Sequence, residues 1–172
     1  MSIKMRWLGT ACFEIVLPNK KTIVIDPYLD DSVSAPITSD KIEGCDYIFL
    51  THGHYDHVLD VGKLAKRFDP KIFCSDVAAG SYPDPSIIEV AQQAQAYITL
   101  LQVLPGRTLR GLEEQTASLA MASGCKIVVP QHYDPLFEGS EKTDLTQLKK
   151  ILEEKTDIIF QELVPGRWYS FD

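Results

Sequence analysis

The chain has 172 residues, of which 45% are hydrophobic and 24% are charged, the composition of an ordinary globular protein. This length favours one domain, spanning residues 1–172, that buries a core of its own. The formal net charge of -7 and the lack of any run of Lys or Arg argue against electrostatic capture of nucleic acid or anionic lipid.

The sequence also indicates a cellular location. No apolar run approaches the roughly 20 residues that a membrane-spanning helix requires, and the first residues lack the layout of a secretory signal. We therefore expect a cytoplasmic protein. The cysteines Cys12, Cys45, Cys74 and Cys125 are widely spaced, which argues against a disulfide framework or a thiolate zinc site. We expect all four to be buried and reduced.

The first fifty residues read as short strands separated by turns, because β-rich runs alternate with Gly, Pro, Asn and Asp. The expected strands are 5–8, 12–17, 22–25 and 45–50. A turn at Pro18-Asn19 predicts that the second and third of these strands form a hairpin. Residues 30–40 show no hydrophobic period, so we expect a loop there.

Strands alternate with helices in the rest of the chain. Apolar residues at helical spacing predict a helix over residues 58–68, which ends at Asp69-Pro70. Further helices are expected over residues 87–95, 113–123 and 143–154, the last of them capped by Thr143. Further strands are expected over residues 71–74, 98–103, 126–129, 158–163 and 168–171. This order predicts the α/β (α+β) class, with sheets covered by helices.

Three of the four histidines fall within six residues, directly after the strand expected over residues 45–50. His52 and His54 are two residues apart, so their side chains can project to the same side and reach one ion. Asp56 and His57 add a carboxylate and a third imidazole in the same short segment. Imidazole and carboxylate are ligands suited to zinc, iron or manganese. Because polar rings at the end of a buried strand would otherwise cost stability, the sequence predicts a metal site here.

Residues 51–57, Thr-His-Gly-His-Tyr-Asp-His, resemble the T-H-x-H-x-D-H signature of the metallo-β-lactamase superfamily of metal-dependent hydrolases. Other segments agree with this resemblance: Trp7-Leu8-Gly9, residues 12–15, residues 25–29, and residues 128–134, which resemble the terminal histidine motif. The likeness is greatest to the branch that contains ascorbate-6-phosphate lactonase. It implies an αββα four-layer sandwich with the site on loops at one edge of the paired sheets.

The resemblance also implies roles for particular residues. The metal ligands that it assigns are His52 and His54 for a first ion, and Asp56, His57 and His132 for a second. Asp26 matches a buried aspartate that orients the ligands from behind. Two ions, zinc or else manganese or iron, would hold a hydroxide between them. Asp56 is the expected catalytic residue, because it could guide a proton toward the leaving group.

The sequence departs from the family pattern at the first ion. No histidine occurs between His57 and His132, so this ion lacks its third imidazole. The family's Gly-Asp turn, which supplies a bridging aspartate, has no clear match near Gly80-Ser81. Asp76 and Asp84 are the candidate substitutes for that aspartate.

The family pattern also has several strands in its second half that find no counterpart between residues 71–74 and Gly80. A sheet without its adjacent strands would expose edges and apolar faces, which is a liability for a protein in solution. We therefore hypothesise that an internal segment is missing from this sequence, with the join near Ala79 and Gly80.

Together these features favour a metal-dependent hydrolase that uses a metal-activated hydroxide to cleave an ester, lactone or phosphoester bond of a small molecule. The alternative is a degenerate, non-catalytic metal-binding protein on the same scaffold, which the missing imidazole favours. Nuclease activity has the least support, because the chain is acidic and has no stripe of basic and aromatic residues. The identity of the substrate and the formation of a homo-oligomer stay open.

The missing-segment hypothesis makes a prediction about mass. If a segment is absent between Ala79 and Gly80, protein isolated from its natural source will be heavier than the 19.3 kDa of this sequence. Mass spectrometry of the intact protein checks this expectation. A measured mass of 19.3 kDa would refute the hypothesis.

Overall fold

The structure, a computed structural model, describes residues 2–74, 98–102, 113–122, 124–136 and 138–172. The chain divides into two compact units. The first unit is Met1–Gln93 with Val164–Asp172, and the second unit is Ala94–Leu163. Among the described residues, no helix is both long and apolar enough to span a bilayer. The prediction of one domain over residues 1–172 stays a prediction.

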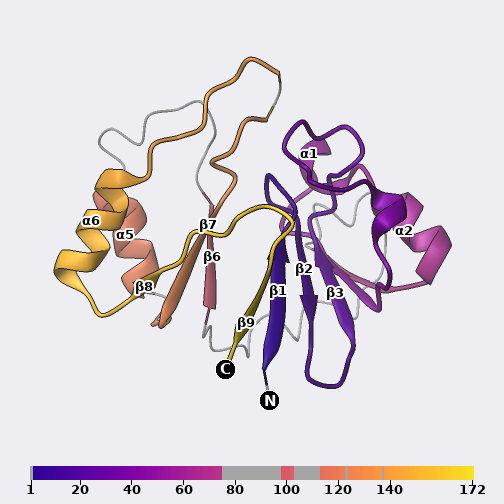
Figure 1. The fold of residues 1–172 in the computed structure, drawn as a ribbon, viewed down its shortest axis with the longest axis horizontal. Coiled ribbons are helices and arrows are strands. Elements are labelled where there is room, and N and C mark those ends of the chain that lie inside the picture. The colour runs from indigo at the N-terminus through magenta and orange to yellow at the C-terminus, as the bar shows by residue number, and fades with distance from the viewer. Residues whose placement is uncertain (1, 75–97, 103–112, 123, 137) are drawn as a thin grey trace. The chain divides into compact units, whose positions relative to one another are not determined.

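The first unit is built on a six-stranded mixed sheet in the order β5-β4-β3-β2-β1-β9 (Figure 1). Its strands are β1 (Ile3–Trp7), β2 (Phe13–Val16), β3 (Thr22–Ile25), β4 (Tyr47–Phe49), β5 (Lys71–Phe73) and β9 (Trp168–Phe171). The pairing of β2 with β3 is antiparallel and confirms the hairpin predicted at Pro18-Asn19. β1 pairs antiparallel with β2 and β9, whereas β4 and β5 run parallel to β3.

The parallel part of this sheet explains how distant residues meet. The carboxyl ends of parallel strands lie at the same edge of a sheet. Two backbone hydrogen bonds continue the ladder just past the strands: Asp26 N donates to Phe49 O (3.0 Å), and Leu50 N donates to Phe73 O (2.7 Å). The residues that follow β3 and β4 therefore lie side by side at this edge.

The helices of the first unit are α1 (Tyr55–Val58), α2 (Val61–Phe68) and the short 3₁₀ helix η1 (Ser39–Lys41). The prediction of one unbroken helix over residues 58–68 is wrong at its start, because the chain breaks at Asp60. The backbone N–H of Asp60 donates to Pro27 O (3.1 Å), which draws this residue out of the helical path. The loop predicted over residues 30–40 likewise ends in η1.

Asp60 also secures the loop that follows β3. Its Oδ2 accepts hydrogen bonds from Leu29 N (2.7 Å) and Asp30 N (3.1 Å). Lys63 Nζ contacts Asp30 Oδ2 at 2.6 Å and Asp60 Oδ1 at 2.8 Å. Burial alone would raise the pKa of Asp30, but the hydrogen bonds from Lys63 and Ser39 outweigh burial and lower that pKa to about 2.

The core of the first unit fills the space between the sheet and α2. Its buried members are apolar side chains and cysteines: Leu8, Cys12, Val24, Leu29, Ile42, Cys45, Ile48, Leu50, Val61, Leu64 and Cys74. All four cysteines of the chain are buried and form no disulfide, as predicted. Burial raises the pKa of Cys12 and raises that of Cys45 to about 12, so both thiols stay protonated and unreactive at neutral pH.

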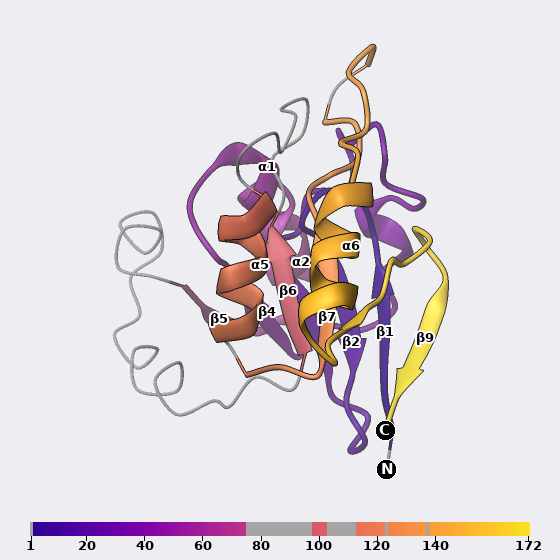
Figure 2. The same ribbon diagram turned by 90° about the vertical axis from the view of Figure 1, so that its left-hand side faces the viewer.

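The second unit contains a three-stranded parallel sheet in the order β6-β7-β8. Its strands are β6 (Ile98–Gln102), β7 (Ile127–Gln131) and β8 (Ile159–Phe160). Two helices, α5 (Glu113–Ala122) and α6 (Thr146–Lys155), lie beside each other over one face of this sheet (Figure 2). Lys155 Nζ joins them by an ion pair with Glu114 Oε2 at 2.8 Å.

Two predictions for the second unit need correction. Thr143 does not cap α6: its backbone N–H donates to Tyr133 O (2.8 Å), and the helix begins at Thr146. Asp144 Oδ1 instead accepts from Thr146 N (2.9 Å) in the turn before the helix. The strand predicted over residues 158–163 is confined to Ile159–Phe160. The helix predicted over residues 87–95 lies outside the described residues.

A pair of glycine substitutions tests the packing of the first unit. Gly9 has φ +92, and a Cβ there would lie 2.9 Å from Ser34 Oγ and 3.1 Å from Ala35 N. We expect Gly9→Ala to lower the free energy of unfolding by about 1–3 kcal/mol. Gly62→Ala is the matched control: it adds a Cβ to α2 where nothing lies within 4 Å, and it should raise that free energy by up to about 1 kcal/mol. Urea denaturation measures both, and an unchanged midpoint for Gly9→Ala would contradict the close approach.

The lowered pKa of Asp30 predicts a contribution to acid stability. A carboxyl group whose pKa is lower in the folded state stabilises the fold above its unfolded pKa, near 4, and loses this effect as the pH falls toward about 2. Between about pH 4 and 2, the slope of the unfolding free energy against pH reports how many more protons the unfolded state binds than the folded state. We expect Asp30→Asn to lower that number by at most about one. Denaturant unfolding at a series of pH values measures this slope, and identical slopes in the two proteins would count against the role of Lys63.

Candidate metal centre

Asp26 is the buried centre of the histidine-rich edge of the first unit. It directly follows β3, is 0% exposed and has a positive φ of 43°, a conformation rarely adopted by residues other than glycine. Its Oδ1 accepts from Thr51 N (2.8 Å), and its Oδ2 accepts from Thr51 Oγ1 (2.6 Å). The same Oδ2 lies 2.8 Å from His57 Nδ1. One carboxylate therefore fixes both the start and the end of the segment 51–57.

His52 and His54 present two nitrogens to one point. His52 Nε2 and His54 Nδ1 are 3.0 Å apart, and the two ring centroids are 4.5 Å apart. Two neutral imidazole nitrogens at this separation are joined either by a hydrogen bond, with the proton on one of them, or by a metal ion that both bind. Two nitrogens bound to one tetrahedral zinc ion at about 2.0–2.1 Å would be roughly 3.3 Å apart. The observed spacing is close to that value.

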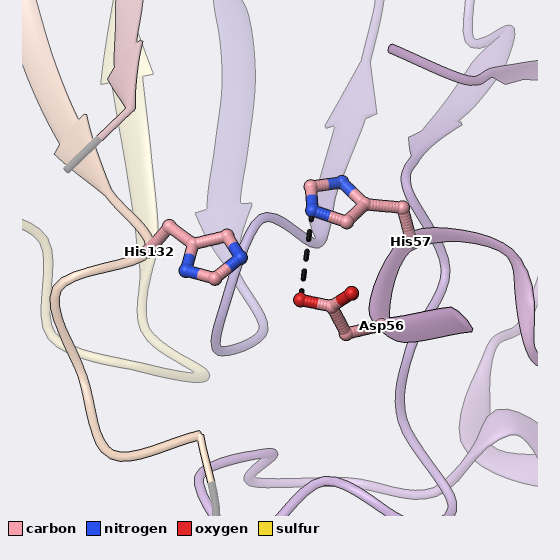
Figure 3. Close-up of side chains that lie close together, drawn as sticks. All are labelled: Asp56, His57 and His132. Carbon is pink, nitrogen blue, oxygen red and sulfur yellow. Dashed lines mark ion pairs between the residues drawn. The ribbon is translucent and has the colours of Figure 1, made fainter. Parts of the chain in front are cut away.

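Asp56 and His57 form a second pair, on the first turn of α1. Both side chains are buried, with exposed fractions of 6% and 1%. His57 Nδ1 faces Asp26, so its Nε2 faces the other way and lies 3.7 Å from Asp56 Oδ2 (Figure 3). A carboxylate accepts but does not donate, so the proton of a neutral His57 lies on Nδ1. The lone pair of His57 Nε2 and the Asp56 oxygen are therefore directed to the same region.

The surroundings of His52 favour the uncharged imidazole. Burial first, and then the neighbouring rings of His57 and His54, lower the pKa of His52. Its ring centroid lies 3.9 Å from that of His57. Neutral imidazole is the form that binds a metal ion. The close approach of these rings thus favours the form of His52 that a metal ion would bind.

His132 lies in the second unit, where it directly follows β7 (Figure 3). It is 4% exposed and has a positive φ of 60°. Buried side chains in such sparsely populated conformations are typical of functional sites. The adjacent Gln131 is also buried, and its Oε1 has no hydrogen-bond partner within the part of the chain that the structure describes. A water molecule or a ligand could satisfy this acceptor.

The structure therefore brings together five of the six predicted site residues within the first unit: Asp26, His52, His54, Asp56 and His57. From the sequence, Thr51 was recognised only as part of the 51–57 motif, and the contact of its hydroxyl with Asp26 was not predicted. Prediction from the sequence also missed Asp60, whose only signal was its place three residues after His57. Asp76, Asp84 and Gly80-Ser81 lie outside the described residues.

The donor set fits a metal ion of the kind predicted. Imidazole nitrogens and a carboxylate oxygen converge in the first unit. Thr51 contacts His52 in one pair and Asp26 contacts His57 in the other, and protein metal ligands are usually oriented by such contacts. His52 Nε2 and His54 Nδ1, 3.0 Å apart, are close enough to bind one ion after a small adjustment. Histidine and carboxylate ligands are compatible with zinc, iron and manganese alike, so the geometry does not select among these metals.

Comparison with known proteins gives independent information. The sequence model of the Metallo-beta-lactamase superfamily matches residues 5–156. A UPF0173 metal-dependent hydrolase of Koribacter versatilis is 38% identical over 72 residues, which cover 42% of this chain and 31% of the relative. Another UPF0173 metal-dependent hydrolase, from an Anaeromyxobacter species, is 35% identical over 166 residues, covering 88% of this chain and 60% of the relative. The chain thus spans between about a third and 60% of the length of these two relatives.

A solved structure resembles the whole chain. Igni18, described as a novel metallo hydrolase from the archaeon Ignicoccus hospitalis, matches with a TM-score of 0.75 over 100% of this chain and 99% of its own. At 17% identity this likeness concerns the fold, and it confirms the fold class predicted from the sequence. The superfamily match extends from β1 into α6 and includes the histidine-rich segment and His132. The chain therefore belongs to the metallo-β-lactamase superfamily.

Proposed function

We propose that this protein is a metal-dependent hydrolase that cleaves an ester, lactone or phosphoester bond of a small molecule. One observation carries the proposal: His52 Nε2 and His54 Nδ1 converge to 3.0 Å on the edge that also holds the buried Asp56 and His57. The names of the relatives, metal-dependent hydrolases, support it. Because many chemistries share this fold, the choice among the three bond types rests on the substrate tests below.

The proposal divides the ligands between two ions. His52 and His54 would hold the first ion; Asp56, His57 and His132 would hold the second. The assignment of His132 rests on its place directly after β7 and on the family resemblance of residues 128–134. We propose zinc in both positions, with manganese or iron as the alternatives, because all three accept imidazole and carboxylate ligands.

The residues of the chain would share the remaining tasks. When bound, such ions lower the pKa of a water molecule to near neutrality and polarise the bond under attack. Asp26 keeps the proton of His57 on Nδ1 through the 2.8 Å contact, so that Nε2 stays available as a ligand. Asp56 is placed to accept a proton and pass it to the leaving group, because its carboxylate lies beside the ligand nitrogens.

A non-catalytic metal-binding protein is the second candidate. The observation that favours it is the absence of any histidine between His57 and His132 in the sequence, which leaves the first ion with two imidazoles. Such a protein would bind at most one ion and would turn over no substrate. Nuclease activity remains the third candidate, and a failure to bind RNA at any salt concentration would exclude it.

We also propose that the protein acts in the cytoplasm on a substrate free in solution. Its four cysteines are buried and form no disulfide, a state that a reducing compartment maintains. The formal charge of -7 disfavours a polyanionic substrate such as nucleic acid.

Substitution of one ligand from each pair tests the mechanism. We expect the wild type to bind about two zinc or manganese ions and to hydrolyse model phosphodiesters or lactones. His54→Ala should bind about one ion fewer, and both His54→Ala and Asp56→Asn should lose at least about 100-fold in kcat/KM, because each removes a metal ligand. Metal analysis of the purified proteins and initial-rate assays measure these effects.

Asp46→Asn is the matched control for Asp56→Asn. Asp46 precedes β4 at the opposite edge of the sheet, where its carboxylate contacts Lys21 and Thr22 N. We expect wild-type metal content and activity from this variant. Unchanged activity in both His54→Ala and Asp56→Asn would remove the proposed mechanism. Metal content of one ion or less in the wild type, with no turnover on a broad panel, would favour the non-catalytic candidate.

A further inference from the structure

Thr51, the residue before the first histidine, contacts both the buried carboxylate and a metal ligand. Its Oγ1 donates to Asp26 Oδ2 at 2.6 Å and lies 3.0 Å from His52 Nδ1. We propose that Thr51 is a positioning residue that sets the tautomer of His52, so that Nε2 is already the nitrogen offered to a metal ion before the ion arrives. This inference rests on the proposed function, in which His52 and His54 hold one ion.

The number of protons available to Asp26, Thr51 and His52 fixes this tautomer. An ionised carboxylate can only accept hydrogen bonds, and a threonine hydroxyl has a single proton to donate. That proton goes to Asp26, because Oδ2 lies at 2.6 Å. In its contact with His52, the Thr51 oxygen can then only accept. His52 Nδ1 must therefore carry the imidazole proton, and a neutral His52 has its lone pair on Nε2.

The next contact along the segment agrees with this assignment. His52 Nε2, with its lone pair, lies 3.0 Å from His54 Nδ1 and can accept a hydrogen bond from it. Three hydrogen bonds therefore point in one direction in the metal-free protein, from His54 to His52, from His52 to Thr51, and from Thr51 to Asp26. His52 then already offers a lone pair to an ion, whereas His54 gives up its Nδ1 proton when an ion binds. Asp26 sets the direction of these hydrogen bonds, because its buried carboxylate, 0% exposed, can only accept.

Without the Thr51 hydroxyl, the hydrogen bond between His54 and His52 would no longer be connected to the carboxylate of Asp26. His52 is only partly buried, so water could reach the Nδ1 that Thr51 now contacts. A histidine side chain in water prefers to carry its proton on Nε2. His52 would then present an N–H to the ion, and the tautomer would have to change before coordination.

A purely structural role for the threonine side chain can be separated from this one. The backbone N–H of Thr51 donates to Asp26 Oδ1 at 2.8 Å, and this bond holds the segment whatever the side chain is. Thr51 is exposed, so replacing its hydroxyl by a methyl group creates no cavity. Thr51→Val therefore removes the oxygen and keeps the shape, whereas Thr51→Ser keeps the oxygen.

The experiment compares wild type, Thr51→Val and Thr51→Ser as full chains. Nitrogen-15 NMR of the imidazole rings, after removal of metal with a chelator, reports which nitrogen of His52 carries the proton. Titration with zinc alone reports affinity. We expect the Nδ1–H tautomer in wild type and Thr51→Ser, and the Nε2–H tautomer in Thr51→Val. Zinc affinity should fall about 10- to 100-fold in Thr51→Val, the usual effect of losing a residue that orients a ligand, and should be retained in Thr51→Ser.

Two results would overturn the proposal: the Nδ1–H tautomer of His52 in Thr51→Val, or an equal loss of zinc affinity in Thr51→Ser and Thr51→Val. Circular dichroism and thermal unfolding confirm that each variant is folded, and Thr51→Ala takes the place of Thr51→Val, with the same expectations, if the valine variant does not fold. A wild type that binds no zinc contradicts the proposed function instead, and the tautomer comparison still decides the role of Thr51.

Discussion

The carboxylate of Asp26 organises the histidine-rich edge of the first unit. It is fully buried at the end of β3, and its side chain contacts the segment that follows β4 through Thr51 N, Thr51 Oγ1 and His57 Nδ1. A buried carboxylate is stable only when its oxygens accept hydrogen bonds. Three donors within 2.8 Å meet that requirement, so the same bonds that stabilise Asp26 also fix the positions of the candidate ligands.

The sheet makes this arrangement possible. β3 and β4 are adjacent and parallel, so their carboxyl ends bring Asp26 and Thr51 together although 25 residues separate them. Asp60 and Lys63 hold the loop after β3 from the other side, through Leu29 N and Asp30. The ligand geometry thus depends on backbone pairing first and on side-chain hydrogen bonds second, and neither requires a metal ion to be present.

Prediction from the sequence found the strands because they leave local patterns, and for the same reason it could propose a set of candidate ligands. The alternation around Pro18-Asn19 is enough to predict the hairpin, and the spacing of His52, His54, Asp56 and His57 is enough to predict shared coordination. Prediction from the sequence failed where a residue distant in the chain determines a local conformation. The break before α2 depends on the bond from Asp60 N to Pro27 O, and the late start of α6 depends on the bond from Thr143 N to Tyr133 O. The role of Thr51 depends on Asp26, which lies on another strand, so no local pattern could reveal it.

In the metal site that we propose, His52 Nε2 and His54 Nδ1 are two ligands of one ion. A crystal structure of the zinc-loaded protein, with anomalous scattering recorded at the zinc edge, tests this assignment directly. We expect an anomalous peak about 2.0–2.1 Å from both nitrogens, in place of the hydrogen bond that now joins them. An intact 3.0 Å hydrogen bond between His52 and His54, with zinc bound elsewhere, would contradict it.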